Sequence, residues 1–370
     1  MKIAYRAGAL AAAAVLSFSL AACAADNEEP NSAAPTGGPT GTAGLSGTLN
    51  GSGSTAQESA MDAWRAAFQE ANSGLTINYD PVGSGGGITA FTSGAVAWAG
   101  SDSPLKDPDE YTAAQTYCGP DGAINLPVYI SPIAVVFNLE GITSLNLDAA
   151  TIAAIFDGKI TKWNDAAITA LNPDATLPDT AITTVHRSDD SGTTKNFTDY
   201  LSQASGGAWT YPADKVWPIK SGESGEGTSG LIDVVTSTPG TIGYADASKA
   251  GTLGVASIKV GDAWAAPSAE GAATALSTST VASVNGENDL AYKIDRTTTE
   301  AGAYPLFLLS YAVVCQTYTD AATKANVTGF LSYVASAEGQ QAAASAAGSA
   351  PLPADLSTKI ESILADIAAK

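Results

Sequence analysis

Three segments of this chain share one pattern: a loop of glycine and hydroxyl residues that leads into a helical run, with a short strand-like run, residues 75–79, before the second loop. They are residues 49–55, 80–87 and 187–194. Strands that alternate with helices across glycine loops are typical of α/β domains. Each loop also leaves backbone N–H groups unpaired at a helix N-terminus, where an anion can bind. The pattern therefore predicts α/β lobes with three candidate anion sites.

The third loop carries the strongest anion signal. Arg187 supplies a planar guanidinium that suits a tetrahedral oxyanion, and Asp189 lies close enough in sequence to hold it in place. Phe197, Tyr200 and Leu201 then recur at helical spacing. The alternative for this segment is an ordinary helix cap with a surface ion pair.

Composition and incomplete motifs exclude several partners. Gly51 and Gly53 lack the third glycine of a dinucleotide motif, and Lys195 lacks the glycine spacing of a P-loop. The chain has 37 acidic against 17 basic residues and a net charge of −20, which excludes nucleic acid and adsorption to anionic lipid. A buried anion site remains compatible with this charge, because physiological salt screens distant charges within about 8–10 Å.

With these loops and four further segments, the chain resembles the PstS family, the phosphate-binding proteins of phosphate-specific ABC importers. The matching segments occur in the family's order between about residues 45 and 355, and the run Lys162-Trp163-Asn164-Asp165 is the most distinctive. The further segments are residues 96–105, 155–165, 171–173 and 238–244.

The resemblance implies a set of phosphate contacts and no cofactor or metal. Asp189 matches the carboxylate that orients the family's arginine. Ala56 replaces a bulkier apolar residue, but its expected contact is through the backbone amide. The implied ligand residues are Ser54, Thr55, Ala56, Ser84 and Asp102 on one wall, and Arg187, Ser191, Gly192 and Thr193 on the other.

Asp102 has a chemical rationale in such a site. Phosphate near neutral pH carries a proton and sulfate carries none, so a carboxylate can accept a hydrogen bond only from phosphate. A site that binds a substrate hydroxyl rejects analogues that lack it by roughly 10⁴ to 10⁵. The alternative is that Asp102, which precedes Ser103 and Pro104, is merely a turn residue.

The resemblance also implies the architecture: a two-lobe, type II periplasmic-binding-protein fold (Venus flytrap) with the ligand in the interlobe cleft. We expect the chain to cross between lobes near residues 131 and 303. Lobe one then contains residues 45–131 and 303–370, and lobe two contains residues 132–302. The glycine-rich run 222–227 is interpreted as a loop without an assigned role.

The N-terminus predicts export and anchoring. Lys2 and Arg6 precede a short apolar run, and residues 1–22 form the expected signal peptide. The ending Leu-Ala-Ala-Cys resembles a bacterial lipoprotein box, which implies cleavage before Cys23 and its acylation. Residues 23–44 would be a disordered tether. We expect a monomer on the outer face of the cytoplasmic membrane, with ABC permease subunits as its partners.

Cys118 and Cys315 are the cysteines left after Cys23 is assigned to lipid. In an exported protein such a pair predicts a disulfide, worth up to roughly 5 kcal/mol in the chain-entropy model. Two reduced, buried cysteines are the alternative.

An enzyme is the rival class. A phosphatase or serine hydrolase would use Ser191 with His186, the chain's only histidine. A metal phosphatase normally needs several His and carboxylate ligands. Other receptor ligands are sulfate, molybdate and arsenate, and Asp102 argues against the first two because they offer no proton.

Overall fold

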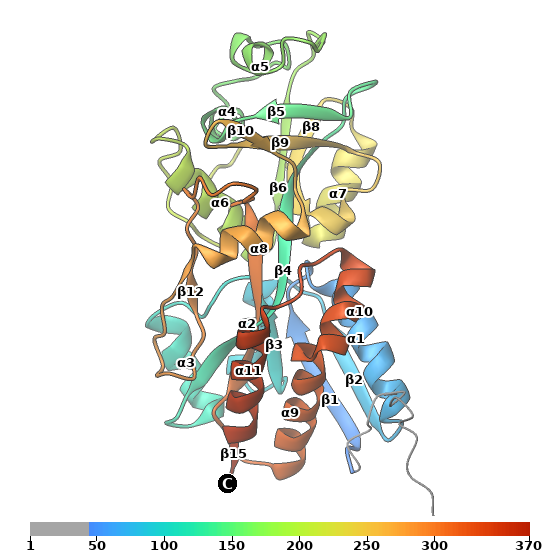
Figure 1. Ribbon diagram of the computed structural model, residues 1–370, viewed down its shortest axis with the longest axis vertical. Coiled ribbons are helices and arrows are strands. Elements are labelled where there is room, and N and C mark those ends of the chain that lie inside the picture. The colour runs from blue at the N-terminus through green and yellow to red at the C-terminus, as the bar shows by residue number, and fades with distance from the viewer. Residues whose placement is uncertain (1–43) are drawn as a thin grey trace, which may run out of the picture. The chain divides into compact units, whose positions relative to one another are not determined.

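Two long strands, β4 (Ala123–Phe137) and β13 (Phe307–Cys315), form the centre of the computed structural model, which describes residues 44–370. Every residue of both strands is buried. β13 pairs with β4 up to Pro132, and β4 pairs with β8 from Ile133 onward. β4 therefore passes from one lobe into the other (Figure 1), and its change of partner lies beside the predicted crossing near residue 131.

One mixed sheet runs through both lobes. Its order is β2-β1-β3-β13-β4-β8-β6-β7, and β9 joins β4 at the second-lobe end. β1 is parallel to β2 and β3, and β6 is parallel to β7 and β8. The carboxyl ends of parallel strands in both lobes can therefore face the same cleft. The α/β prediction is confirmed.

The elements on the first-lobe side are β1 (Gly47–Gly53), α1 (Glu58–Ala71), β2 (Leu75–Asp80), α2 (Ser84–Thr92), β3 (Trp98–Ser101), α3 (Asp109–Cys118), β11 (Thr280–Val281), β12 (Tyr292–Lys293), β14 (Thr317–Tyr318), α9 (Ala321–Ala335), α10 (Ala337–Ala347), α11 (Ala354–Asp366) and β15 (Ala368–Ala369). Those of the second lobe are β5 (Ser144–Leu147), α4 (Ala149–Phe156), α5 (Ala166–Leu171), β6 (Thr183–Arg187), α6 (Gly192–Ala204), β7 (Glu223–Gly225), α7 (Gly227–Ser237), β8 (Thr241–Asp246), the 3₁₀ turn Ala247–Lys249, β9 (Gly254–Val260), β10 (Ala263–Ala265) and α8 (Ala269–Ser277).

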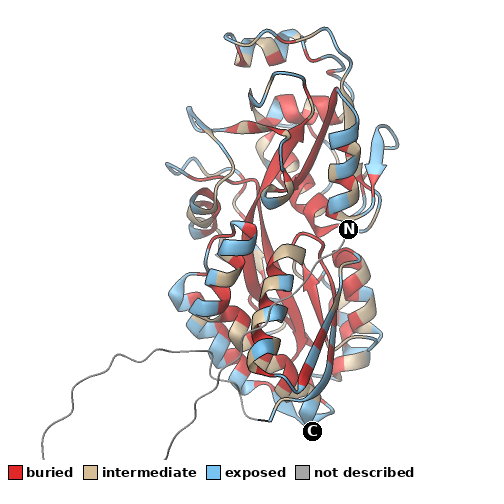
Figure 2. Cartoon of the chain, turned by 90° about the vertical axis from the view of Figure 1, so that its right-hand side faces the viewer, coloured by how far each residue is buried: buried red, intermediate tan, exposed pale blue. Residues whose placement is uncertain are grey.

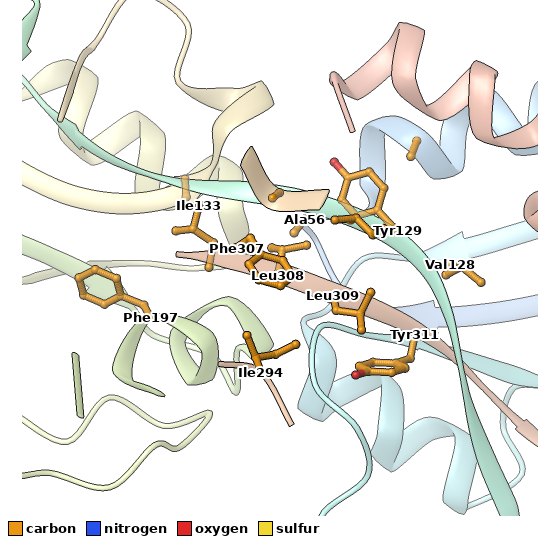
Figure 3. Close-up of a cluster of buried hydrophobic side chains, with 14 of the residues drawn as sticks. Ala56, Val128, Tyr129, Ile133, Phe197, Ile294, Phe307, Leu308, Leu309 and Tyr311 are labelled. Atoms are coloured by element: carbon orange, nitrogen blue, oxygen red, sulfur yellow. The ribbon is translucent and has the colours of Figure 1, made fainter. Parts of the chain in front are cut away.

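The helices bury the apolar stripes that the sequence predicts. α1 buries Met61, Trp64 and Phe68, and α6 buries Phe197 and Tyr200 among others. Burial concentrates in the sheet and on the inward faces of the helices (Figure 2). Apolar side chains continue across the strand crossings between the lobes (Figure 3). This apolar core therefore packs around the strands that pass between the lobes and border the cleft.

The cysteines Cys118 and Cys315 are bonded to each other. Their Sγ atoms are 2.01 Å apart and their Cα atoms 5.1 Å apart, at a sequence separation of 197. The bond joins the end of α3 to the end of β13, and both side chains are buried.

The segment from β11 to β12 departs from the predicted lobe boundary. Residues 132–302 were all expected in the second lobe, whereas Asp289 accepts hydrogen bonds from the Tyr111 hydroxyl at 2.6 Å and from the Asn125 backbone at 2.9 Å. Both partners belong to the first lobe. The boundary differs because this buried carboxylate finds its donors on α3 and β4, a long-range pairing that no local pattern marks.

The structure describes no residue before 44. The predicted signal peptide, Cys23 and nearly all of the tether lie outside the described residues. Within residues 44–370, no helix is both long enough and apolar enough to cross a membrane.

Candidate functional site

The three predicted loops connect β1 to α1, β2 to α2, and β6 to α6. The helix predicted after each loop is confirmed, as is the strand before the second loop, but residues 49–53 of the first predicted loop belong to β1. The first two loops come from the first lobe and the third from the second, so the cleft brings together segments more than 100 residues apart.

Asp102 lies at the centre of this cluster, directly after β3, and is only 2% exposed. Three hydroxyls donate to its carboxylate: Ser54 at 2.5 Å, Ser310 at 2.7 Å and Thr193 at 3.1 Å. Its backbone N–H donates to Ser84 Oγ at 3.1 Å. Asp102 is therefore a rigidly held acceptor rather than an exposed turn residue.

Burial raises the pKa of Asp102 above its ordinary value. Hydrogen bonds from Ser54 and Ser310, the nearby Arg187 charge and the Thr193 hydroxyl all act in the opposite direction on this pKa. These donors stabilise the ionised carboxylate in a place where desolvation alone would favour the neutral acid.

Arg187 is the cation of the site and is 3% exposed. Its Nε and Nη2 donate to the two carboxylate oxygens of Asp189 at 2.7 and 2.5 Å. Asp189 Oδ1 also accepts the backbone N–H of Gly227 at 3.0 Å. This bidentate contact fixes one edge of the guanidinium. The opposite edge makes no hydrogen bond to any residue that the structure describes.

The N-terminus of α6 lies beside Arg187. Ser191 is its N-cap, and Ser191 Oγ accepts the N–H of Thr194 at 3.2 Å. A Cβ atom at Gly192 would lie 2.5 Å from Ser84 Oγ and 2.8 Å from Asp102 Cβ. Only glycine permits so close an approach, which brings the positive end of α6 against the first-lobe wall.

Hydrogen bonds join the two walls around the cluster. Thr55 Oγ1 and Thr228 Oγ1 are 2.8 Å apart, and the Gly85 N–H donates to the Asp190 carbonyl at 2.9 Å. The cleft is therefore in a closed arrangement. All nine expected ligand residues are buried or line the interior of this cluster.

One expected contact is already used within its own loop. The Ala56 N–H donates to Ser54 Oγ at 3.1 Å. This hydrogen bond within the first loop orients the Ala56 amide. The residue is 0% exposed.

Several residues of the candidate site were not predicted from the sequence. The run 222–227, interpreted as a loop, instead forms β7 and the start of α7, because Glu223 to Gly225 pair with β6. The Gly227 N–H of this run donates to Asp189, and the hydroxyl of the next residue, Thr228, lies within hydrogen-bond distance of the Thr55 hydroxyl. Ser310 also has a recognisable signal, since it is the one small polar residue in the otherwise apolar and aromatic run 306–314.

Asn196 is a further contributor from α6. Its Nδ2 donates to the Asp102 carbonyl at 2.5 Å and to the Gly192 carbonyl at 2.9 Å. Its Oδ1 accepts from Arg296, a residue 1% exposed that also donates to the carbonyls of Pro305 and Phe307. Asn196 thus links the second-lobe helix to the first-lobe acceptor.

The residues of the rival enzyme make other contacts. His186 stacks on Trp217, with ring centroids 5.2 Å apart and an interplanar angle of 9°. Its Nδ1 lies 2.9 Å from the Arg187 carbonyl oxygen. Ser191 Oγ is used as a helix cap. Within residues 44–370, no group of three or more His, Cys, Asp and Glu is placed to hold a metal ion.

Known proteins share this architecture. Residues 38–338 match the PBP superfamily domain. A structure described as a high-affinity periplasmic phosphate-binding protein bound with phosphate at pH 8.5 has a TM-score of 0.68 at 22% identity, covering 85% of this chain and 93% of that one. That likeness confirms the two-lobe fold.

Curated sequence relatives have a higher sequence identity to this chain than that structure has. Phosphate-binding protein PstS3 of Mycobacterium bovis (strain BCG / Pasteur 1173P2) is 41% identical over 332 residues, which is 88% of each chain. Phosphate-binding protein PstS2 of the same strain is 36% identical over 373 residues, covering 97% of this chain and 98% of the relative. Sequence identity of this extent shows that the chain belongs to the PstS family of phosphate-binding proteins.

Proposed function

We propose that this protein is the extracytoplasmic receptor that captures inorganic phosphate and delivers it to an ABC importer. Phosphate binds between the lobes, with Arg187 and the α6 N-terminus on one side and Asp102 with its hydroxyls on the other. Contact with both walls favours the closed form.

The observation that carries this proposal is the pairing of a buried cation with a buried acceptor. The Arg187 guanidinium is oriented by Asp189 along one edge only, so its other edge can donate to an oxyanion. Asp102 faces the same cleft and is held by three hydroxyl donors. A ligand that accepts from the arginine and donates to the carboxylate is a protonated oxyanion.

The expected contacts follow from this geometry. Ser54, Thr55 and the Ala56 amide contact phosphate from the first loop, Ser84 from the second, and Ser191, Gly192 and Thr193 from α6. Asp189 acts through Arg187. These assignments are supported by the burial of the residues and by the family's pattern.

Calorimetric titration of the ligand-stripped protein with phosphate tests the proposal. We expect tight one-to-one binding that a large excess of sulfate leaves unchanged. Absent binding, or binding that sulfate abolishes, would contradict it. Arsenate resembles phosphate in shape and protonation and is expected to compete.

The receptor has no catalytic role in this proposal. The contacts of His186 and Ser191 support this, because the imidazole stacks on Trp217 and the hydroxyl caps a helix. Turnover of a phosphate ester by the purified protein, lost in Ser191→Ala, would contradict it.

The proposal includes attachment of the mature chain to the outer face of the cytoplasmic membrane by acyl groups on Cys23, as a monomer. The Leu-Ala-Ala-Cys sequence supports it. Mass spectrometry of the membrane-extracted protein should show an acylated N-terminal cysteine, and Cys23→Ala should prevent acylation. An unmodified cysteine in the membrane fraction would contradict this attachment.

A further inference from the structure

A cavity of about 290 Å³ adjoins the site on the side of Asp102 and Asn196. Both lobes line it. β13 contributes Leu309 and Tyr311, which line the cavity together with Ile294 (all three are labelled in Figure 3), and α6 contributes Lys195 and Asn196. The cavity therefore opens from the cleft between the lobes rather than from the interior of either lobe.

Two lysines on this cavity make no ion pair. Lys195 on α6 is partly buried and Lys293 on β12 is exposed, and neither ammonium has a hydrogen-bond or salt-bridge partner within residues 44–370. Two nearby cationic side chains, in contrast, do form ion pairs. Lys215 pairs with Glu110 at 2.5 Å, and Arg296 pairs with Asp199 at 2.9 Å.

Lys195 is electrostatically under-compensated. Burial lowers its pKa, and the neighbouring Lys215 charge lowers this pKa further, while Glu110, Asp199 and Asp214 act the other way. Two of those three carboxylates are already paired with other cations. An anion in the cavity would restore favourable interactions to this ammonium.

The other sides of the site are bridged by hydrogen bonds. Thr55 and Thr228 join the lobes on one side, and Gly85 and Asp190 join them on another. On the cavity side the Asn196 amide reaches the Asp102 carbonyl, and Arg296 joins Asn196 to the Phe307 carbonyl. Asp102 itself lines the cavity, so an anion held there lies next to the site.

We propose that this cavity is an anion vestibule, in which Lys195 and Lys293 hold inorganic phosphate transiently before it passes to Asp102 and Arg187. The proposal rests on the proposed function of that site. Its physical reason is the net charge of −20, which repels the ligand from most of the surface. A local pair of cations without ion-pair partners among the described residues raises the ligand's concentration at the cleft and its association rate.

Stopped-flow measurement of phosphate association, followed by tryptophan fluorescence at low and physiological ionic strength, tests the vestibule. Lys195→Gln and Lys293→Gln should each lower the association rate constant, and together by about 3- to 10-fold. The dissociation rate constant should not change, and Kd should rise by the same factor. Salt should slow association less in the double variant than in the unmodified protein.

The controls separate local charge from net charge. Lys324→Gln on α9 and Lys359→Gln on α11 match the two lysines in burial and are expected to leave association unchanged. Lys195→Arg keeps the charge and should retain the rate. An unchanged association rate in the double variant, an equal effect in the controls, or an effect confined to dissociation would overturn the vestibule. If the unmodified protein itself showed no phosphate binding, the proposed function would fail first.

Discussion

The two walls of the site are built from different chemistry and different stretches of sequence. The second-lobe wall comes from the consecutive residues 187–194 and presents the Arg187 guanidinium and a helix N-terminus. The first-lobe wall is assembled from Ser54, Ser84, Asp102 and Ser310, and it offers a carboxylate held by hydroxyls. In the proposed function, the second-lobe wall attracts any oxyanion and the first-lobe wall selects a protonated one.

Arg187→Ala should have the largest effect on affinity. It removes the cation and leaves Asp189 facing the ligand, so phosphate, arsenate and any residual sulfate binding should all weaken by about 2–5 kcal/mol. Calorimetry with each anion measures this loss. Arg65→Ala, which removes an arginine paired with Asp62 on α1, is the matched control and should bind as before. A loss for phosphate alone would break the division between the walls.

Asp102→Asn should change selection more than attraction. The amide can donate to a fully ionised oxyanion, whereas the carboxylate repels it. We expect sulfate to become a competitor, with discrimination reduced at least about tenfold from the roughly 10⁴ to 10⁵ typical of such sites. Phosphate titrations with and without sulfate measure the change. If this variant still rejected sulfate, Asp102 would not be the residue that selects a protonated ligand.

The same difference explains how much of the site the sequence could predict. The second-lobe wall is local, so its arginine, its orienting carboxylate and its helix are visible in one run of residues. Asp102 needed the family's pattern to be placed, because a lone Asp before Ser-Pro has an ordinary turn interpretation. Ser310 and Thr228 join the site through strand pairing and lobe closure, which depend on contacts between residues 173 or more positions apart.

The fold follows the same rule. Glycine loops and apolar stripes predicted the helix after each loop, because these are short-range signals, although residues 49–53 of the first predicted loop form strand β1. The segment from β11 to β12 was assigned to the wrong side, because its position is determined by a buried hydrogen-bond network centred on Asp289. Long-range polar pairing of this kind leaves no periodic trace in the sequence.

Asn196→Ala tests whether the walls act as one unit. The substitution leaves the Asp102 and Gly192 carbonyls without the Asn196 donor, which should cost about 1–3 kcal/mol in the closed form. Phosphate should therefore dissociate faster, by roughly tenfold. Asn172→Ala is a matched control, since Asn172 is also buried and donates to two carbonyls away from the cleft. Equal destabilisation of folding in both variants, with unchanged dissociation, would show that Asn196 is only structural.

Ser310→Ala should have the smallest effect, and that effect should depend on pH. Ser310 donates to Asp102 Oδ1 at 2.7 Å, and its hydrogen bond lowers the pKa of Asp102 against the effect of burial. Without this donor the pKa of Asp102 rises further. A protonated Asp102 cannot accept the ligand's proton, so the pH below which affinity falls should move upward.

Near pH 8 the expected loss of affinity in Ser310→Ala is about 1 kcal/mol, and it should grow as the pH is lowered. The ratio of variant to unmodified Kd, measured at each pH, removes the titration of phosphate itself from the comparison. Ser205→Ala, which removes a buried hydroxyl from the second lobe, provides a reference. A pH-independent ratio would mean that Ser310 contributes packing alone, and that Ser54 and Thr193 suffice to keep Asp102 ionised.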